Sequence, residues 1–240
     1  MKRISLDETV STNRYARELP EDQNHGLTLV TAEFQTAGRG AGTNKWESER
    51  GGNLLFSIVA YPRQLQAGQM FSLSEVTALA ICDTLNGYAD GFLIKWPNDI
   101  YHADSKAVGM LIENDLQGKL VRRSVIGIGV NINQTLFRSD APNPVSLAQI
   151  LGHREERNQV LDRIIQQFIY YYGMMEEGRY AELHRLYMQQ LYRKDEFHQY
   201  ADDKGTFTAR IIDVEPTGHL ILEDKDKQTR RYAFKEVRFI

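Results

Sequence analysis

Apolar stretches bounded by turn residues predict most of a β-sheet in the first half of the chain. Such stretches of strand length favour strands over helices, and they lie at residues 27–34, 54–60, 92–96 and 121–132. The third of them ends at Pro97, which cannot donate to a ladder. Residues 100–102 and 106–113 flank a polar turn and predict a hairpin. The first half therefore contains at least one sheet.

Helical spacing of apolar residues identifies the predicted helices. Residues 71–88 follow this spacing, and a short helix over 14–19 is expected between the capping residues 11–13 and Pro20. Two amphipathic helices are predicted further on, where apolar side chains recur on one face. They are marked by Val160, Ile164, Phe168 and Tyr172, and by Tyr180, Leu183 and Tyr187.

The C-terminal segment returns to a strand pattern. Apolar residues alternate over 207–211, and short strands are predicted at 220–222, 232–234 and 237–239. Short strands with turn residues between them indicate a small barrel joined to an α+β domain. We therefore expect a larger domain over residues 1–190 and a smaller β domain over 191–240.

Composition and charge exclude several classes of protein. A net charge of −3 and a pI of about 6.1 give no overall attraction to nucleic acid or to anionic lipid. The N-terminal residues contain no apolar run that would serve as a signal peptide or membrane span. Cys82 is the single cysteine, and no histidines share a metal-binding spacing, so no dedicated protein metal site is expected. Cytoplasm is the expected compartment.

A glycine-rich stretch over residues 35–46 is the first candidate site. Gly38, Gly40 and Gly42 allow backbone N–H groups to converge on an anion, while Arg39 and Lys45 add charge. General nucleotide motifs do not match it: the P-loop ending is absent, and Thr43 stands where the dinucleotide fingerprint requires glycine. Taken alone, this stretch would also fit a flexible surface loop.

Three further stretches carry polar groups at strand ends or glycines inside strands. Residues 95–99 (Lys-Trp-Pro-Asn-Asp) place charges at the end of a strand, and Lys106 opens the apolar strand 106–113. Residues 127–131 contain two glycines, which indicate a bulge or the close approach of another group. Each stretch alone would also fit an ordinary turn or core strand.

In this combination and order, the motifs resemble those of the biotin protein ligases. The resemblance extends from about Leu6 to Ile132, and more loosely through Gly218 and the final strands. It implies an α+β fold with a mixed-sheet catalytic domain of the biotin/lipoate ligase type and a small C-terminal SH3-like β-barrel. It also implies that biotin is activated with ATP to biotinyl-5'-AMP, with release of pyrophosphate. Biotin then passes to a lysine of a biotin carboxyl carrier protein or domain, such as that of acetyl-CoA carboxylase.

The same resemblance assigns roles to individual residues. Lys106, Arg39 and Asp99 would be catalytic. Biotin would be bound by Ser11, Thr12, Asn13, Gln35, Gly38, Arg39, Gly40, Lys106, Gly109, Leu111, Gly127 and Gly129. ATP and its Mg²⁺ would be placed by Arg39, Trp46, Lys95, Asn98 and Asn131.

Two departures from the family pattern carry expectations. Relatives commonly have a second basic or long polar residue after Gly-Arg-Gly, where this chain has Ala41, so the loop is expected to close less firmly over the adenylate. Some relatives begin with a DNA-binding domain, whereas here the biotin motif starts at Ser11. We therefore expect an enzyme of the monofunctional type that does not bind DNA. A homodimer joined along a sheet edge is an open alternative to a monomer.

Other readings remain open at the sequence level. A lipoate ligase or octanoyltransferase shares the implied fold, but the transferase needs a reactive cysteine, and Cys82 lies in an apolar helix where an inert thiol is expected. A binding module without chemistry would not need Lys106, Arg39 and Asn131. A nucleic-acid-binding barrel is disfavoured, because the basic residues of 223–231 alternate with acidic ones.

Overall fold

A mixed seven-stranded sheet forms the larger part of the molecule. The computed structural model describes residues 1–21, 26–42, 44–138 and 143–240; Thr43 lies outside them. The strand order is β1-β2-β3-β7-β6-β5-β4, with β1 parallel to β2 and every other neighbouring pair antiparallel. The strands are β1 (Lys2–Thr9), β2 (Thr28–Gln35), β3 (Leu54–Ala60), β4 (Phe92–Lys95), β5 (Asp99–His102), β6 (Ser105–Gln117) and β7 (Leu120–Val130).

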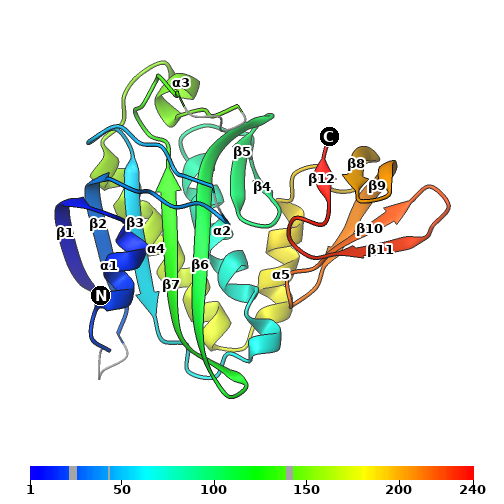
Figure 1. Cartoon of the computed structure of the whole chain (residues 1–240), viewed down its shortest axis with the longest axis horizontal. Coiled ribbons are helices and arrows are strands. Elements are labelled where there is room, and N and C mark those ends of the chain that lie inside the picture. The colour runs from blue at the N-terminus through cyan, green and yellow to red at the C-terminus, as the bar shows by residue number, and fades with distance from the viewer. Residues whose placement is uncertain (22–25, 43, 139–142) are drawn as a thin grey trace.

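Helices cover both faces of this sheet (Figure 1). One face carries the long helices α2 (Ser72–Asn86), α4 (Arg157–Glu176) and α5 (Tyr180–Gln189). The short helix α1 (Thr12–Glu18) lies on the other face against β2, β3 and β7, where Ala16 packs with Val30, Val59 and Val125. Strand β3 is buried along its whole length, because side chains on both of its faces are covered.

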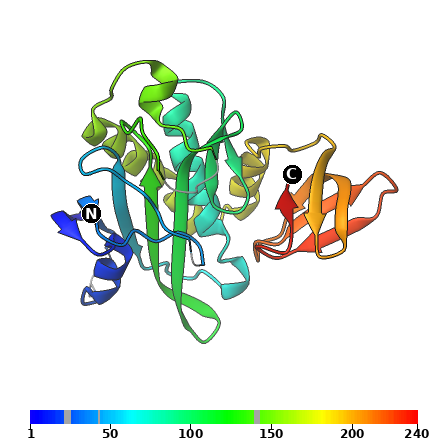
Figure 2. The same ribbon diagram turned by 45° about the horizontal axis from the view of Figure 1, so that its top comes forward.

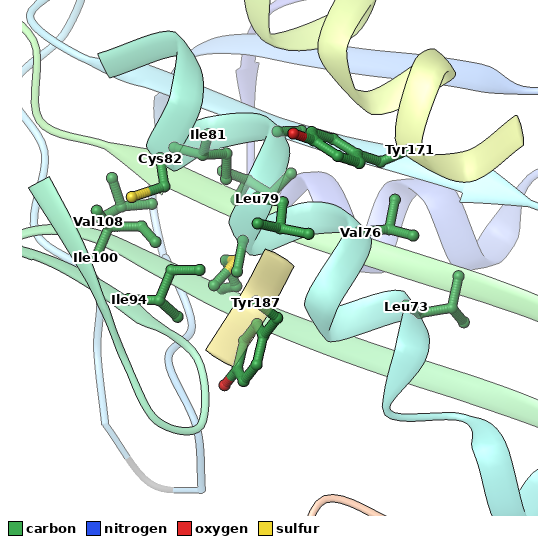
Figure 3. Close-up of a cluster of buried hydrophobic side chains, with 14 of the residues drawn as sticks. Leu73, Val76, Leu79, Ile81, Cys82, Ile94, Ile100, Val108, Tyr171 and Tyr187 are labelled. Atoms are coloured by element: carbon green, nitrogen blue, oxygen red, sulfur yellow. The ribbon is translucent and has the colours of Figure 1, made fainter. Parts of the chain in front are cut away.

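The main hydrophobic core lies between the sheet and the long helices. Figure 3 shows Leu79 of α2, Tyr171 of α4 and Tyr187 of α5 in this core, together with Ile100 and Val108 of the sheet. Burial of such side chains removes apolar surface from water and is the main stabilising contribution to the fold. None of the described helices is both long enough and apolar enough to span a membrane.

A second, antiparallel sheet lies at the C-terminal end, beside α5 (Figure 2). Its strand order is β11-β10-β9-β8-β12. Tyr200, Ala209, Ile211 and Leu222 are fully buried. The strands are β8 (His198–Asp202), β9 (Gly205–Val214), β10 (Leu220–Asp224), β11 (Thr229–Tyr232) and β12 (Arg238–Phe239).

Most predicted elements are found with small shifts of their ends. The predicted strand 232–234 is wrong beyond Tyr232, because β11 ends there and the chain turns at once, with the Glu236 N–H donating to the Ala233 carbonyl. The α+β prediction with a mixed sheet is confirmed, and the second sheet is consistent with an SH3-like domain. Among the described residues, four elements were not predicted: β1, β8, the short helix α3 (Leu147–Leu151) and a single 3-10 turn, η1 (Ala67–Gln69). Helix α3 begins with a capping box in which Ser146 and Gln149 exchange side-chain and backbone hydrogen bonds.

Candidate active site

A cavity of about 900 Å³ opens where β5, β6 and β7 meet the glycine-rich loop and the C-terminal sheet. Of the residues that the sequence predicts for the site, Gly38 is the one that does not line this cavity. A Cβ atom at Gly38 would lie 2.5 Å from the Trp46 carbonyl oxygen, so this glycine instead allows the two arms of the loop to approach. The lining residues from the predicted set are Ser11, Thr12, Asn13, Gln35, Arg39, Gly40, Trp46, Lys95, Asn98, Asp99, Lys106, Gly109, Leu111, Gly127, Gly129 and Asn131.

Neutral polar groups form one wall of the cavity. The Thr12 backbone N–H and hydroxyl both donate to Gln35 Oε1, at 2.7 and 3.1 Å. Ser57, which is fully buried on β3, has its Oγ 2.8 Å from Thr12 Oγ1 and 2.6 Å from Asn13 Oδ1. These contacts fix the first residues of α1 against the sheet. The resulting wall can hydrogen-bond to an uncharged polar group of a ligand.

Glu113 connects this wall to the glycine-rich loop. Its Oε2 accepts from Asn13 Nδ2 at 3.0 Å, while its Oε1 lies 3.2 Å from the Arg17 guanidinium and 3.4 Å from that of Arg39. Leu111 also participates, since its carbonyl accepts from Asn13 Nδ2 at 3.1 Å. Sequence reasoning missed both Ser57 and Glu113, because nothing in their local sequence distinguishes them from other strand residues.

Glycines on β6 and β7 make room for side chains that form the cavity walls. Gly109 and Gly129 are paired across the two strands, and a Cβ on either would lie 2.7 or 2.3 Å from the Trp46 indole. A Cβ on Gly127 would lie 2.2 Å from Asn13 Oδ1. The expected close approach is therefore present. The approaching groups are the side chains of Trp46 and Asn13.

Lys106 and Asp99 form an ion pair beside the indole. Their Nζ and Oδ1 atoms are 2.7 Å apart, and the side chains are 24% and 15% exposed. The Lys106 ammonium also lies 5.8 Å from the Trp46 ring centroid, within the range of a cation–π contact. A positive charge thus lies where little water screens it, in a position suited to bind an anion.

Lys95 is a second positive charge at the cavity, and its side chain lies against aromatic rings. Its Nζ is 5.0 Å from the Tyr101 centroid and 4.8 Å from that of Phe239. Burial lowers the pKa of Lys95, an effect that the nearby Asp99 carboxylate opposes. Phe239 belongs to β12, so the C-terminal sheet contributes directly to the surroundings of this lysine.

Two asparagines fix the backbone around the charged pair. Asn98 Nδ2 donates to the Met110 carbonyl at 2.6 Å. Asn131 Nδ2 donates to the Val145 carbonyl at 3.2 Å, while its Oδ1 is buried without a hydrogen-bond partner among the described residues. That oxygen is available to accept from a ligand or to bind a cation.

Cys82 lies away from the cavity. Its side chain is fully buried in α2, with Sγ 3.1 Å from the Phe92 carbonyl oxygen. Burial raises the pKa of the Cys82 thiol far above its usual range, so the reactive thiolate is suppressed. Because the chain has no other cysteine, the cavity contains no thiol nucleophile.

The C-terminal sheet completes the cavity, which the sequence did not predict. Its contributions come from the segment after β11, namely Phe234, Lys235, Val237, Arg238 and Phe239. No local signal in these residues indicates that they face a site. Their role depends on how the two sheets pack together.

The chain matches the sequence model of the Biotin/lipoate A/B protein ligase family over residues 5–131. It is 28% identical over 236 residues to the bifunctional ligase/repressor BirA of Bacillus subtilis (strain 168), covering 96% of this chain and 72% of that protein. It is 31% identical over 200 residues to the biotin–[acetyl-CoA-carboxylase] ligase of Paracoccus denitrificans, covering 80% and 81%.

A solved structure shows the same fold over the whole chain. The biotin protein ligase from Aquifex aeolicus in complex with biotin and ATP superposes with a TM-score of 0.82 at 24% identity, covering 100% of this chain and 99% of that one. This likeness concerns the fold, including the strands that carry the motifs around the cavity. With more than half of its length matched by the family model, this chain belongs to the Biotin/lipoate A/B protein ligase family.

Proposed function

We propose that this chain is an ATP-dependent biotin protein ligase. The observation that carries the proposal is the Lys106–Asp99 pair, placed in one cavity with a wall of neutral hydrogen-bonding groups around Thr12 and Gln35. Biotin has matching chemistry, because it combines an uncharged ureido ring with a carboxylate at the far end of an apolar chain. The relatives named as biotin ligases support this substrate.

In the first step, a biotin carboxylate oxygen would attack the α-phosphorus of ATP. The phosphorus–oxygen bond to the leaving pyrophosphate breaks, and biotinyl-5'-AMP forms. Because two anions must approach each other, fixed positive charge and N–H donors lower the barrier. Lys106 and Arg39 supply this charge. A protein nucleophile is not required, since biotin itself attacks.

In the second step, the amine of an acceptor lysine would attack the acyl carbon, and AMP would leave. The amine must first lose a proton to become nucleophilic. Asp99 is a carboxylate at the cavity and would orient this amine or accept its proton. The acceptor proposed here is a biotin carboxyl carrier protein or domain.

Ligand contacts are proposed along the two sides of the cavity. Ser11, Thr12, Asn13, Gln35 and the Arg39–Gly40 backbone would hold the biotin ring, with Gly109, Leu111, Gly127 and Gly129 behind it. Gly38, which does not line the cavity, would shape the loop that carries them. Trp46, Lys95, Asn98 and Asn131 would place ATP. No described group of three His, Cys, Asp or Glu residues could hold a metal. Mg²⁺ would therefore be held by the nucleotide phosphates together with oxygens such as Asn131 Oδ1.

Two further proposals accompany this function: the protein is cytoplasmic, and its two domains span residues 1–190 and 191–240. A monomer and a homodimer are both compatible with the proposed reaction. The absence of overall positive charge supports a role without DNA binding.

The decisive experiment is ATP–pyrophosphate exchange with biotin, lipoate or octanoate as the acid. Exchange that depends on biotin alone is expected. Exchange with lipoate would instead assign a lipoate ligase. The absence of exchange with every acid would contradict adenylation and favour a binding module. The buried Cys82 already disfavours the cysteine-dependent transferase.

A further inference from the structure

A tight turn after β11 projects a lysine toward the glycine-rich loop. The Glu236 backbone N–H donates to the Ala233 carbonyl at 3.1 Å, and the Ala233 N–H donates to the Glu236 carboxylate at 2.7 Å. Lys235, inside this turn, has a φ of +74°, in the left-handed region that favours glycine. The position therefore carries a long cationic side chain in a backbone conformation that disfavours any side chain.

This turn is fixed against the ligase domain. Phe234 packs edge-on against Trp96, with ring centroids 6.4 Å apart and an interplanar angle of 75°. Trp96 Nε1 in turn donates to the Gly218 carbonyl of the C-terminal sheet at 2.9 Å. Val237, next after the turn, is buried. The turn thus has a defined position relative to the cavity.

The Lys235 ammonium lies directly over Gly42 of the glycine-rich loop. A Cβ atom on Gly42 would be 2.2 Å from Lys235 Nζ and 3.3 Å from Cε. Ala41 and Lys235 both line the cavity. Within the described residues, no carboxylate forms an ion pair with Lys235, whose Nζ lies 5.7 Å from the centroid of the neighbouring Phe234 ring. Its charge is therefore free to meet an anion beside the part of the loop, Ala41 and Gly42, that carries no charge of its own.

We propose that Lys235 lies beside Ala41 and Gly42 over bound biotinyl-AMP and supplies, from the C-terminal sheet, the positive charge that these two residues lack. This inference rests on the proposed function. The adenylate carries a phosphate anion, which gains a charge-assisted hydrogen bond from an ammonium group. The weaker closure expected from Ala41 would thereby be offset by a residue distant in sequence. Lys235 acts here as a binding residue and takes no part in the chemistry.

The test compares Lys235→Ala with a matched control, Lys227→Ala. Lys227 is also an exposed lysine of the C-terminal sheet with a positive φ, +60°, but it lies on the turn between β10 and β11 and does not line the cavity. Both substitutions therefore remove a lysine from the same type of backbone. Each variant is loaded with biotin and labelled ATP, desalted, and followed for release of biotinyl-AMP.

Release from Lys235→Ala is expected to be roughly tenfold faster than from wild type, the change that loss of one charge-assisted contact produces. Lys227→Ala should release at the wild-type rate. The double variant Ala41→Arg/Lys235→Ala should again release biotinyl-AMP slowly, because the introduced guanidinium places a positive charge beside the same part of the loop. As an independent readout, the adenylate should protect Arg39 and Lys45 from trypsin in wild type and less so in Lys235→Ala.

Equal release and equal protection in wild type and Lys235→Ala would overturn the inference while leaving the proposed function intact. Faster release that Ala41→Arg fails to reverse would likewise overturn it, since the charge would not be the cause. Failure of the wild type to form any adenylate would instead overturn the proposed function, and this inference with it.

Discussion

Lys106 holds its charge in a half-buried place, paired with Asp99 and close to the Trp46 ring. We predict that Lys106→Ala slows biotin-dependent adenylate formation by about a thousandfold, as expected when a group that stabilises transition-state charge is removed. ATP–pyrophosphate exchange measures the rate, and circular dichroism verifies that the variant is folded. Lys119→Ala, on the exposed β6–β7 turn, is the control. Near-normal exchange in Lys106→Ala would remove this lysine from the catalytic set.

Individual site residues were predictable where they belong to a short sequence motif whose residue types indicate the chemistry of the site. Lys95, Asp99 and Lys106 are polar residues at the ends of apolar strands, and the structure brings them to one cavity. Ser57 was not predictable, because a serine within a buried strand shows its role only through its partners Thr12 and Asn13. Contacts across more than forty positions of sequence are set by the fold.

At the scale of elements, Glu113 joins strand β6 to α1 and to the glycine-rich loop. Glu113→Gln would keep an acceptor for Asn13 but remove the charge that faces Arg17 and Arg39. We predict that this variant binds biotin about five- to tenfold more weakly, because two walls of the cavity lose a shared charged contact. Isothermal titration calorimetry with biotin measures the change.

The matched control for this network is Asp115→Asn. Among the described residues, Asp115 forms an ion pair with Arg17 only, at 3.3 Å on an exposed surface, where ion pairs contribute little. It should bind biotin as wild type does. Equal affinities of Glu113→Gln and Asp115→Asn would show that the Glu113 charge does not organise the cavity.

Elements with a strong apolar pattern were predictable, whereas elements held by distant partners were not. Strand β3 is apolar along its length, and its predicted ends, 54 and 60, match the structure. Strand β1 is largely polar and exposed, and it is held by parallel pairing with β2, from Lys2–Thr28 to Thr9–Gln35. Parallel pairing across an intervening helix leaves no local signal in the sequence of the strand.

At the scale of the whole molecule, the packing of the two sheets decides the shape of the cavity. The sequence indicated a small β domain but gave no sign that Phe239 would lie against Lys95. That contact depends on the junction between α5 and the C-terminal sheet, which lie next to each other in Figure 1 and are joined by the ion pair of His184 Nε2 with Asp213 Oδ1, 2.8 Å apart. We therefore expect the ion pairs at this junction to affect how the C-terminal sheet lies against the cavity.

His184 on α5 is the central group of this junction. Its Nδ1 lies 2.8 Å from Glu75 Oε1 on α2, and its Nε2 lies 2.8 Å from Asp213 Oδ1 on β9. Hydrogen bonding to Glu75 raises the pKa of His184 to about 9, with Asp213 adding to the effect and burial opposing it. The charged imidazolium thus links α2 and α5 to strand β9 of the C-terminal sheet at neutral pH.

The stabilisation from His184 should be lost in alkaline solution. Because its pKa in the folded protein lies above the unfolded value of about 6.5, the contribution is complete below that pH and disappears as pH rises through about 9. We predict that between pH 7 and pH 10 the Tm of wild type falls by roughly 2–4 °C more than that of His184→Asn. His153→Asn is the control, since His153 pairs with Glu155 at the surface and is 65% exposed. Parallel changes of Tm with pH in wild type and His184→Asn would show that the histidine does not stabilise the junction between α5 and the C-terminal sheet.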